Sequence, residues 1–153
     1  MKTTEFNIRS YQPEDINSVL AIFDELCPEY FAQEEKQDLI EYLSHKREAY
    51  FVVQENNSQK IVGSGGFNLI ENNSIARLSW DMIHPNFHGQ KLGTFLINFR
   101  ISKLRLLSNQ LKITVRTSQM AYKFYASCGF LLKEIEKDYW AKGFDLYYME
   151  LEK

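Results

Sequence analysis

The sequence has few cysteines and no long apolar run. Its 153 residues include two cysteines, Cys27 and Cys128, which are far apart and lack the spacing of zinc ligands. We therefore expect free thiols rather than a disulfide framework. No apolar stretch reaches the roughly 20 residues that span a bilayer, and the N-terminal residues lack the apolar segment of a signal peptide. These absences predict a cytoplasmic protein with no membrane partner.

A strong excess of charge of one sign is also missing. The 18 basic residues nearly balance the 20 acidic residues, and the formal net charge is −2 at pH 7. Nucleic-acid binding depends on basic residues that neutralise phosphates, so nucleic acid is not an expected partner. The hydrophobic content of 44% is typical of a soluble globular protein. A chain of this length fits one domain, residues 1–153.

The hydrophobic residues change between the period of a strand and the period of a helix along the chain. Alternation and turn signals predict strands over residues 6–11, 49–54, 60–70, 75–83, 111–116, 131–139 and 144–151. Helical spacing predicts helices over residues 14–26, 39–43, 90–107 and 118–128. The strand at 75–83, the long helix and the strand at 111–116 form a βαβ unit, so these two strands should be parallel within a mostly antiparallel sheet. The fold class is therefore α/β (α+β).

The predicted strand at residues 75–83 has an apolar face and a polar face. Alternation places one group on the first face, namely Ala76, Leu78, Trp80 and Met82. It places the other group on the second face, namely Arg77, Ser79 and Asp81. The alternation fails at Met82-Ile83, which predicts a bulge or a strand end there.

Two stretches resemble ligand sites at first sight only. Residues 63–66 (GSGG) look like a nucleotide loop, but Asn68 stands where a dinucleotide fingerprint needs its third glycine, and a strand follows instead of a helix. Small residues in a strand are more typical of a bulge or a close neighbour. His84 and His88 have metal-ligand spacing, but Pro85 lies between them and no third ligand is near in the sequence, so no metal is expected.

Residues 88–94 are a better candidate for a binding site. They follow a strand and begin a helix, so backbone N–H groups without intrahelical partners converge there and can bind an anion. Gly89 and Gly93 allow a ligand to approach closely. The surrounding side chains that donate hydrogen bonds are His88, Gln90, Lys91 and Thr94. The Walker pattern is absent, so ATP or GTP is not implied.

Two motifs resemble those of the GNAT superfamily of N-acetyltransferases. Residues 83–94 (IHPNFHGQKLGT) resemble its acetyl-CoA signature, V-x-P-x-x-[RQ]-G-x-G-x-G-[ST]. Residues 114–130 (TVRTSQMAYKFYASCGF) resemble its second motif, N-x-x-A-x-x-F-Y-x-x-x-G-F. Three positions differ: His88 replaces Arg or Gln, Lys91 replaces the middle glycine, and Ser118 replaces Asn. These differences concern the affinity for the cofactor more than its identity.

The resemblance implies an enzyme that uses acetyl-CoA as co-substrate and no metal. It implies helices on both faces of the sheet and a central parallel strand pair that separates at a bulge, with the pantetheine between the two strands. A backbone N–H at Met82 or Ile83 would bind the thioester oxygen, and the helix start would bind the pyrophosphate, provided that Lys91 is helical. The residues expected to bind the cofactor are Met82, Ile83, His88, Gly89, Gln90, Lys91, Leu92, Gly93, Thr94, Ser118 and Tyr125.

The resemblance also assigns catalytic residues. Tyr125 occupies the family's tyrosine position and is expected to protonate the departing thiolate as a general acid. Asp81 lies near the position of a carboxylate that accepts the amine proton in some relatives. The acetyl group would pass directly to a primary amine of a small molecule or peptide. A non-catalytic acyl-CoA-binding module or sensor is the open alternative.

The amine acceptor is expected between the N-terminal helices and the last hairpin. Residues 25–35 are acidic and aromatic, which favours a cationic amine, although a solvated helix edge explains them equally well. Trp80, Tyr139 and Trp140 are candidates for the wall of the pocket. The C-terminal strands offer an edge that could pair two copies, so a homodimer is a further candidate.

Overall fold

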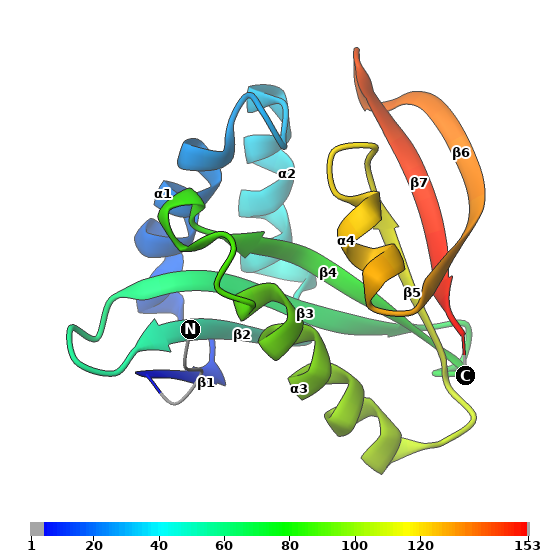
Figure 1. Ribbon diagram of the computed structural model, residues 1–153, viewed down its shortest axis with the longest axis horizontal. Helices are drawn as coiled ribbons and strands as arrows, with labels where there is room; N and C mark the ends of the chain where they lie inside the picture. Colours follow the sequence, from blue (N-terminus) through cyan, green and yellow to red (C-terminus); the bar gives the residue numbers. More distant parts are fainter. Residues whose placement is uncertain (1–4, 153) are drawn as a thin grey trace.

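The computed structural model describes residues 5–152, which form a mixed sheet of seven strands (Figure 1). The strands are β1 (Phe6–Ser10), β2 (Ala49–Glu55), β3 (Ile61–Ile70), β4 (Ile75–Ile83), β5 (Lys112–Thr117), β6 (Phe130–Ala141) and β7 (Phe144–Leu151). The α-helices are α1 (Ile16–Leu26), α2 (Lys36–Glu41), α3 (Leu92–Leu107) and α4 (Tyr122–Ser127). Short 3₁₀ segments lie at Pro13–Asp15, Gln33–Glu35 and Pro85–Phe87, and a π-helical turn at Tyr42–Lys46 continues α2.

The strand order across the sheet is β1-β2-β3-β4-β5-β7-β6. Neighbouring strands are antiparallel except for β4 and β5, which are parallel, as the βαβ unit predicted. Pairing of β4 with β5 ends at Leu78 and Val115, although both strands continue beyond these residues. The two central strands therefore separate toward their C-terminal ends.

Helices cover both faces of the sheet, which confirms the predicted fold class. The apolar stripe of α1, which includes Val19, Ile22 and Phe23, packs with α2 on one face. The stripe of α3, which includes Leu96 and Leu104, packs on the other face together with α4 (Figure 1). Within residues 5–152, no helix combines the length and the apolar character that crossing a membrane requires.

A bulge in β4 lies at Trp80 and Asp81. Ser79 lies opposite Gly66 and Met82 lies opposite Ser64, so Trp80 and Asp81 together lie opposite Gly65 alone. Trp80 has a φ of 51°, a left-handed backbone that accommodates the extra residue. The two alternatives predicted at Met82-Ile83 were a bulge and a strand end. The strand end is confirmed, because β4 ends at Ile83, whereas the bulge lies two residues earlier.

The bulge reverses the face that each following side chain takes. Leu78 packs in the core under α3, whereas Trp80 and Met82 pack with α1 on the opposite face. Asp81 points to α3 and α4, where its hydrogen-bond partners lie. The predicted faces of Trp80, Asp81 and Met82 were therefore wrong, because one extra residue shifts the alternation of a strand by one.

Candidate active site

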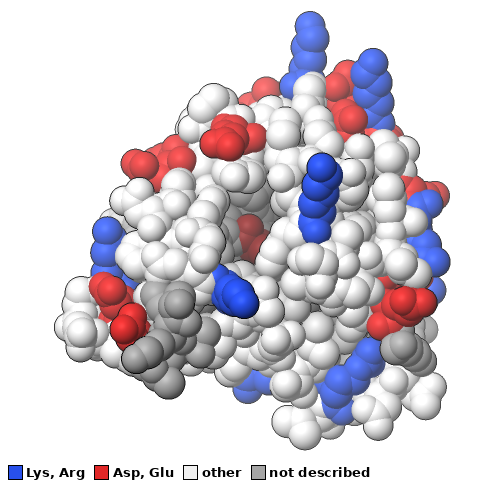
Figure 2. Space-filling view, in the orientation of Figure 1, with Lys and Arg blue, Asp and Glu red and all other residues white. Residues whose placement is uncertain are grey.

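A cavity of about 820 Å³ lies where β4 and β5 separate. Its wall includes the bulged part of β4, the end of β5, the start of α3, α4 and the segment that follows α1. Figure 2 shows a hollow in the middle of this face, with acidic atoms visible in its depth. The two predicted catalytic residues, Asp81 and Tyr125, both line the cavity.

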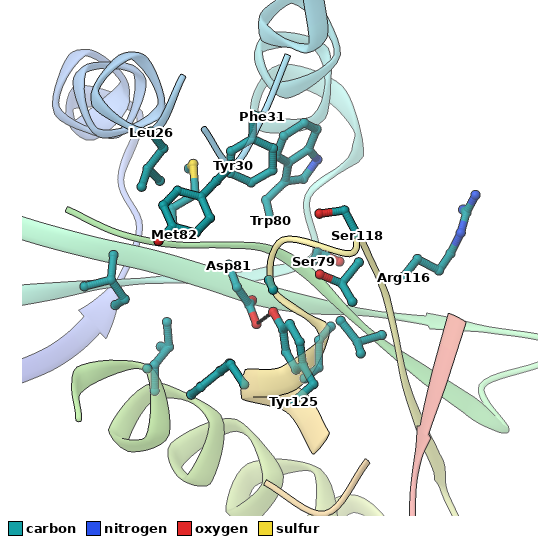
Figure 3. Close-up of a pocket in the computed structure, with 18 of the residues that line it drawn as sticks. Leu26, Tyr30, Phe31, Ser79, Trp80, Asp81, Met82, Arg116, Ser118 and Tyr125 are labelled. Atoms are coloured by element: carbon teal, nitrogen blue, oxygen red, sulfur yellow. Dashed lines mark hydrogen bonds between the residues drawn. The ribbon is translucent and has the colours of Figure 1, made fainter. Parts of the chain in front are cut away.

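Tyr125, Asp81 and Arg100 form a hydrogen-bonded network in the wall of the cavity. The Tyr125 hydroxyl donates to Asp81 Oδ2 over 2.6 Å, and Figure 3 shows the two side chains pointing toward each other. Arg100 Nη1 donates to Asp81 Oδ1 over 2.5 Å and Nη2 donates to Oδ2 over 2.9 Å. Arg100 Nη1 also donates to the carbonyl oxygen of Gly66, and Nε donates to that of Leu96. Both carboxylate oxygens of Asp81 are therefore engaged inside the protein.

The network is buried, and a glycine makes room for it. The Arg100 side chain is 0% exposed and that of Asp81 is 15% exposed. A Cβ on Gly65 would lie 2.7 Å from Asp81 Oδ1 and 3.2 Å from Arg100 Nη1. A side chain at this position would therefore collide with the ion pair, which agrees with the prediction that residues 63–66 mark a close neighbour.

Burial and the carboxylate together set the protonation state of Tyr125. Desolvation raises the pKa of Tyr125 well above the ordinary tyrosine value of 10, and the negative charge of Asp81 raises it further. A group whose pKa is raised keeps its proton to higher pH. The Tyr125 hydroxyl is consequently protonated throughout the physiological range.

Arg100 is a site residue that sequence reasoning missed. It lies four residues after Leu96 and four before Leu104, on the stripe of α3 that packs against the sheet. A charged residue on an otherwise apolar helix face needs a partner of opposite charge, because an unpaired buried charge is strongly unfavourable. This position on the buried stripe was the available signal, and it would have pointed to a carboxylate on the sheet.

The predicted anion site at the start of α3 has free donors. Among the described residues, no protein oxygen accepts a hydrogen bond from the backbone N–H groups of residues 89–94, and Phe95 is the first to bond within the helix, to the carbonyl of Lys91. Gly89, Lys91, Leu92, Gly93 and Thr94 also line the cavity. These N–H groups at a helix start fit the pyrophosphate of a CoA ester.

The conformation of Lys91 differs from the one that was expected. Lys91 has φ 63° and ψ 21°, so it is left-handed rather than helical. A glycine at this position would adopt that backbone freely, whereas a lysine is strained by roughly 1–2 kcal/mol. Lys91 thus adopts a backbone that glycine reaches more readily, and α3 begins directly after it.

His88 and Gly93 contribute to packing around the start of α3. His88 Nε2 donates to the carbonyl of Ile83 over 2.7 Å, and its ring meets the edge of Tyr30 at a centroid distance of 5.5 Å. A Cβ on Gly93 would lie 2.8 Å from the Phe124 ring, so Gly93 lets α3 and α4 pack closely. The ring of His88 is thus bonded to the protein in this structure, and it stabilises the loop before α3.

The backbone of β4 offers one free N–H toward β5 at the predicted position. His84 N–H donates to the carbonyl of Val62, and hydrogen-bonded pairs alternate along antiparallel strands. The N–H of Met82 therefore points toward Ser64 on β3, and that of Ile83 points into the gap beside β5. Of the two predicted residues, Ile83 has the better orientation for binding a ligand between the strands.

Ser118 lies at the cavity but does not begin a helix. Its Oγ accepts the N–H of Met120 over 3.2 Å, while α4 begins only at Tyr122. The predicted helix start was therefore wrong by several residues, because residues 119–121 form a turn first. The Ser118 hydroxyl still lines the cavity (Figure 3).

Aromatic side chains form the other end of the cavity. Figure 3 shows Tyr30, Phe31 and Trp80 grouped on the side of the cavity away from Tyr125, and the rings of Phe31 and Trp80 stack at a centroid distance of 5.8 Å. Glu35 lines the same region, and burial raises the pKa of its carboxyl group. Trp80 and Trp140 therefore line the cavity as predicted, whereas Tyr139 is 42% exposed on β6 and is not part of the wall.

Comparisons with known proteins agree with this geometry. The family described as "Acetyltransferase (GNAT) domain" matches residues 8–153, and no curated protein matches the sequence. The ribosomal-protein-S18-alanine N-acetyltransferase of Escherichia coli has a TM-score of 0.76 at 20% identity, over 95% of this chain and 92% of that one. The N-acetyltransferase of Staphylococcus aureus has a TM-score of 0.73 at 18% identity, over 96% and 98% of the two chains.

A third similar structure was solved with a cofactor. It is yncA of Salmonella typhimurium with acetyl-CoA, and it has a TM-score of 0.74 at 18% identity over 96% of this chain and 93% of that one. These similarities show a shared fold, while the family match covers nearly the whole sequence. The protein therefore belongs to the GNAT acetyltransferase family.

Proposed function

We propose that the protein transfers an acetyl group from acetyl-CoA to a primary amine. The observation that carries this proposal is the position of the Tyr125 hydroxyl, which meets Asp81 in the wall of a cavity that is also lined by Gly89 and by residues 91–94 at the start of α3. A proton donor and a pyrophosphate site thus open onto one space. Acetyl-CoA would supply an activated acetyl group and a thiolate leaving group to that space.

Both backbone N–H groups and side chains would bind acetyl-CoA. The N–H groups of residues 89–94 would hold the pyrophosphate, with Lys91 adding a positive charge. The Ile83 N–H would hold the thioester oxygen, where preorganised donors stabilise developing negative charge. Ser118 would contact the pantetheine arm from the β5 side.

The acid role falls to Tyr125. A tyrosine hydroxyl is protonated at neutral pH, and the raised pKa of Tyr125 keeps it protonated to higher pH, so the proton that the departing sulfur needs would be present. Asp81 accepts the single Tyr125 O–H and Arg100 holds Asp81. To act as the acid, the hydroxyl would turn this O–H to the sulfur, and Tyr125 would then regain a proton from solvent in the cavity. Because both oxygens of Asp81 are already engaged, we assign it to positioning Tyr125 rather than to accepting the amine proton, which can leave through the solvent-accessible cavity.

A non-catalytic acyl-CoA sensor is the competing function. It would share the pyrophosphate site and the cavity, but it has no need of a protonated hydroxyl aligned by a buried ion pair. The Tyr125–Asp81–Arg100 network therefore favours the enzyme.

The test is the variant Tyr125→Phe, with Tyr122→Phe as the matched control. Tyr122 is on the same helix and packs on Tyr147. We expect Tyr125→Phe to bind acetyl-CoA as the wild type does in calorimetry, while turnover in a thiol-release assay falls by about 10²-fold or more. Tyr122→Phe should keep both properties. Equal turnover of the two variants would exclude Tyr125 as the acid.

A further inference from the structure

Arg77 is a cavity residue whose guanidinium lacks a hydrogen-bond acceptor within residues 5–152. It lies on β4, before the bulge, and lines the cavity. Among the described residues, no group accepts a hydrogen bond from its guanidinium, and its Nε is buried without a partner. A guanidinium carries five N–H donors, and leaving a buried donor unpaired is unfavourable.

A second arginine lies beside it. Arg77 is in register with Thr114 on β5, so Arg116, two residues later, is on the same face of the sheet. Arg116 also lines the cavity, where its guanidinium lies 5.4 Å from the centre of the Trp140 ring and donates a hydrogen bond to the hydroxyl of Tyr139. Neither arginine forms an ion pair with a carboxylate of residues 5–152.

The two positive charges disfavour each other. Burial lowers the pKa of Arg77, and the charge of Arg116 lowers it further. The acidic side chain on the neighbouring strand, Glu150, accepts a hydrogen bond from Tyr148 and lies 3.8 Å from Lys112. An anion bound between Arg77 and Arg116 would relieve both the unpaired donors and the repulsion.

The pyrophosphate of the cofactor is not this anion. Arg77 precedes Ile83 by six residues along β4, which corresponds to roughly 20 Å of extended strand. The helix start that receives phosphate lies beyond Ile83, on the α3 side of the cavity. The unpaired guanidinium therefore faces the part of the cavity that is left for the acceptor.

We infer that the acceptor carries a carboxylate in addition to its amine, and that Arg77 and Arg116 bind this carboxylate. This inference rests on the proposed function, because it names the class of substrate for the same site. Figure 3 shows Arg116 extending away from the pair formed by Asp81 and Tyr125. The amine and the carboxylate are consequently at opposite ends of an extended molecule, as in an ω-amino acid or a short peptide with a free C-terminus.

Pairs of ligands that differ only in a carboxylate or a carboxamide test whether the site binds a negative charge, and binding can be measured without acetyl transfer. Protein saturated with CoA is titrated by calorimetry with β-alanine, γ-aminobutyrate, ε-aminocaproate and diglycine, and with the carboxamide of each. For at least one pair we expect the acid to bind about tenfold or more tightly than its amide, the size typical of hydrogen bonds to a charged group. The chain length that binds best distinguishes free amino acids from peptides.

Variants assign the effect to the two arginines. Arg77→Gln and Arg116→Gln should each reduce the preference for acid over amide severalfold, and Arg77→Lys should restore part of it because the charge is kept. Arg105→Gln is the control, since Arg105 on α3 bonds to the carbonyl of Leu111 and lies outside the cavity wall. It removes the same charge and should keep the preference.

Two results would overturn the inference. One is that no acid binds better than its amide to the wild type, and the other is that the preference survives in Arg77→Gln and Arg116→Gln. The proposed function fails separately, if acetyl-CoA and the same panel of amines release no thiol. If the carboxamides are acetylated as fast as the acids, the protein is an acetyltransferase but its acceptor does not need a carboxylate.

Discussion

The variant Asp81→Asn tests the buried network directly. The substitution keeps the size of the side chain and leaves an oxygen that can accept the Tyr125 hydrogen bond, but it removes the negative charge beside Arg100. Because the Arg100 side chain is 0% exposed, its guanidinium is left without a counter-charge. Removing one partner of a buried ion pair costs about 3–5 kcal/mol. The Asp81 side chain is 15% exposed and the Asn oxygen still accepts, so we expect the lower end of this range.

Urea denaturation at neutral pH measures this loss. In a thermal unfolding experiment, a loss of about 3 kcal/mol corresponds to a fall in Tm of roughly 6–12 °C for a chain of this size. The variant Arg100→Met and the double variant complete the cycle. The double variant removes both charges, so it should be at least as stable as Asp81→Asn alone. Losses that simply add, or a loss below about 1 kcal/mol for Asp81→Asn, would refute the ion-pair reasoning.

Three further substitutions test other parts of the account. Gly65→Ala places a Cβ 2.7 Å from Asp81 Oδ1, so we expect a loss of about 1–3 kcal/mol in urea denaturation and lower turnover, with unchanged acetyl-CoA affinity in calorimetry. Lys91→Gly should gain about 1 kcal/mol by relieving the left-handed backbone, while acetyl-CoA binds up to about fivefold more weakly without the ammonium. Asp15→Asn should lose about 1 kcal/mol at pH 7, because hydrogen bonds from Arg9 lower the pKa of this carboxyl group. That contribution is complete above the ordinary pKa of about 3.9 and disappears as the pH falls through the lowered pKa, so the two proteins should converge in acid.

The order of the elements was predictable because their periods are local properties. The parallel pairing of β4 and β5 followed from the helix between them. The bulge was misplaced because the side-chain pattern shows where alternation ends and not where an extra residue enters. Its position depends on the register against β3, which is a contact between segments distant in sequence.

The site was predictable where a motif fixes the local backbone, and less so where distant segments meet. The start of α3 and the meeting of Tyr125 with the cavity follow from the two GNAT motifs. Arg100 and Arg77 lie outside those motifs, and their roles depend on which strands they face. Lys91 was expected to be helical because it is not glycine, yet its backbone is left-handed, so residue type alone did not predict the conformation of this turn.

Acetyl transfer to an amine is measured by following both of its products. The protein is incubated with acetyl-CoA and a panel of amines, and mass spectrometry records both free CoA and an acetylated amine. We expect the wild type to form both products in equal amounts and Tyr125→Phe to form them about 10²-fold more slowly. Acetyl-CoA that binds to the wild type but yields no acetylated amine from any acceptor would contradict the account and favour a sensor.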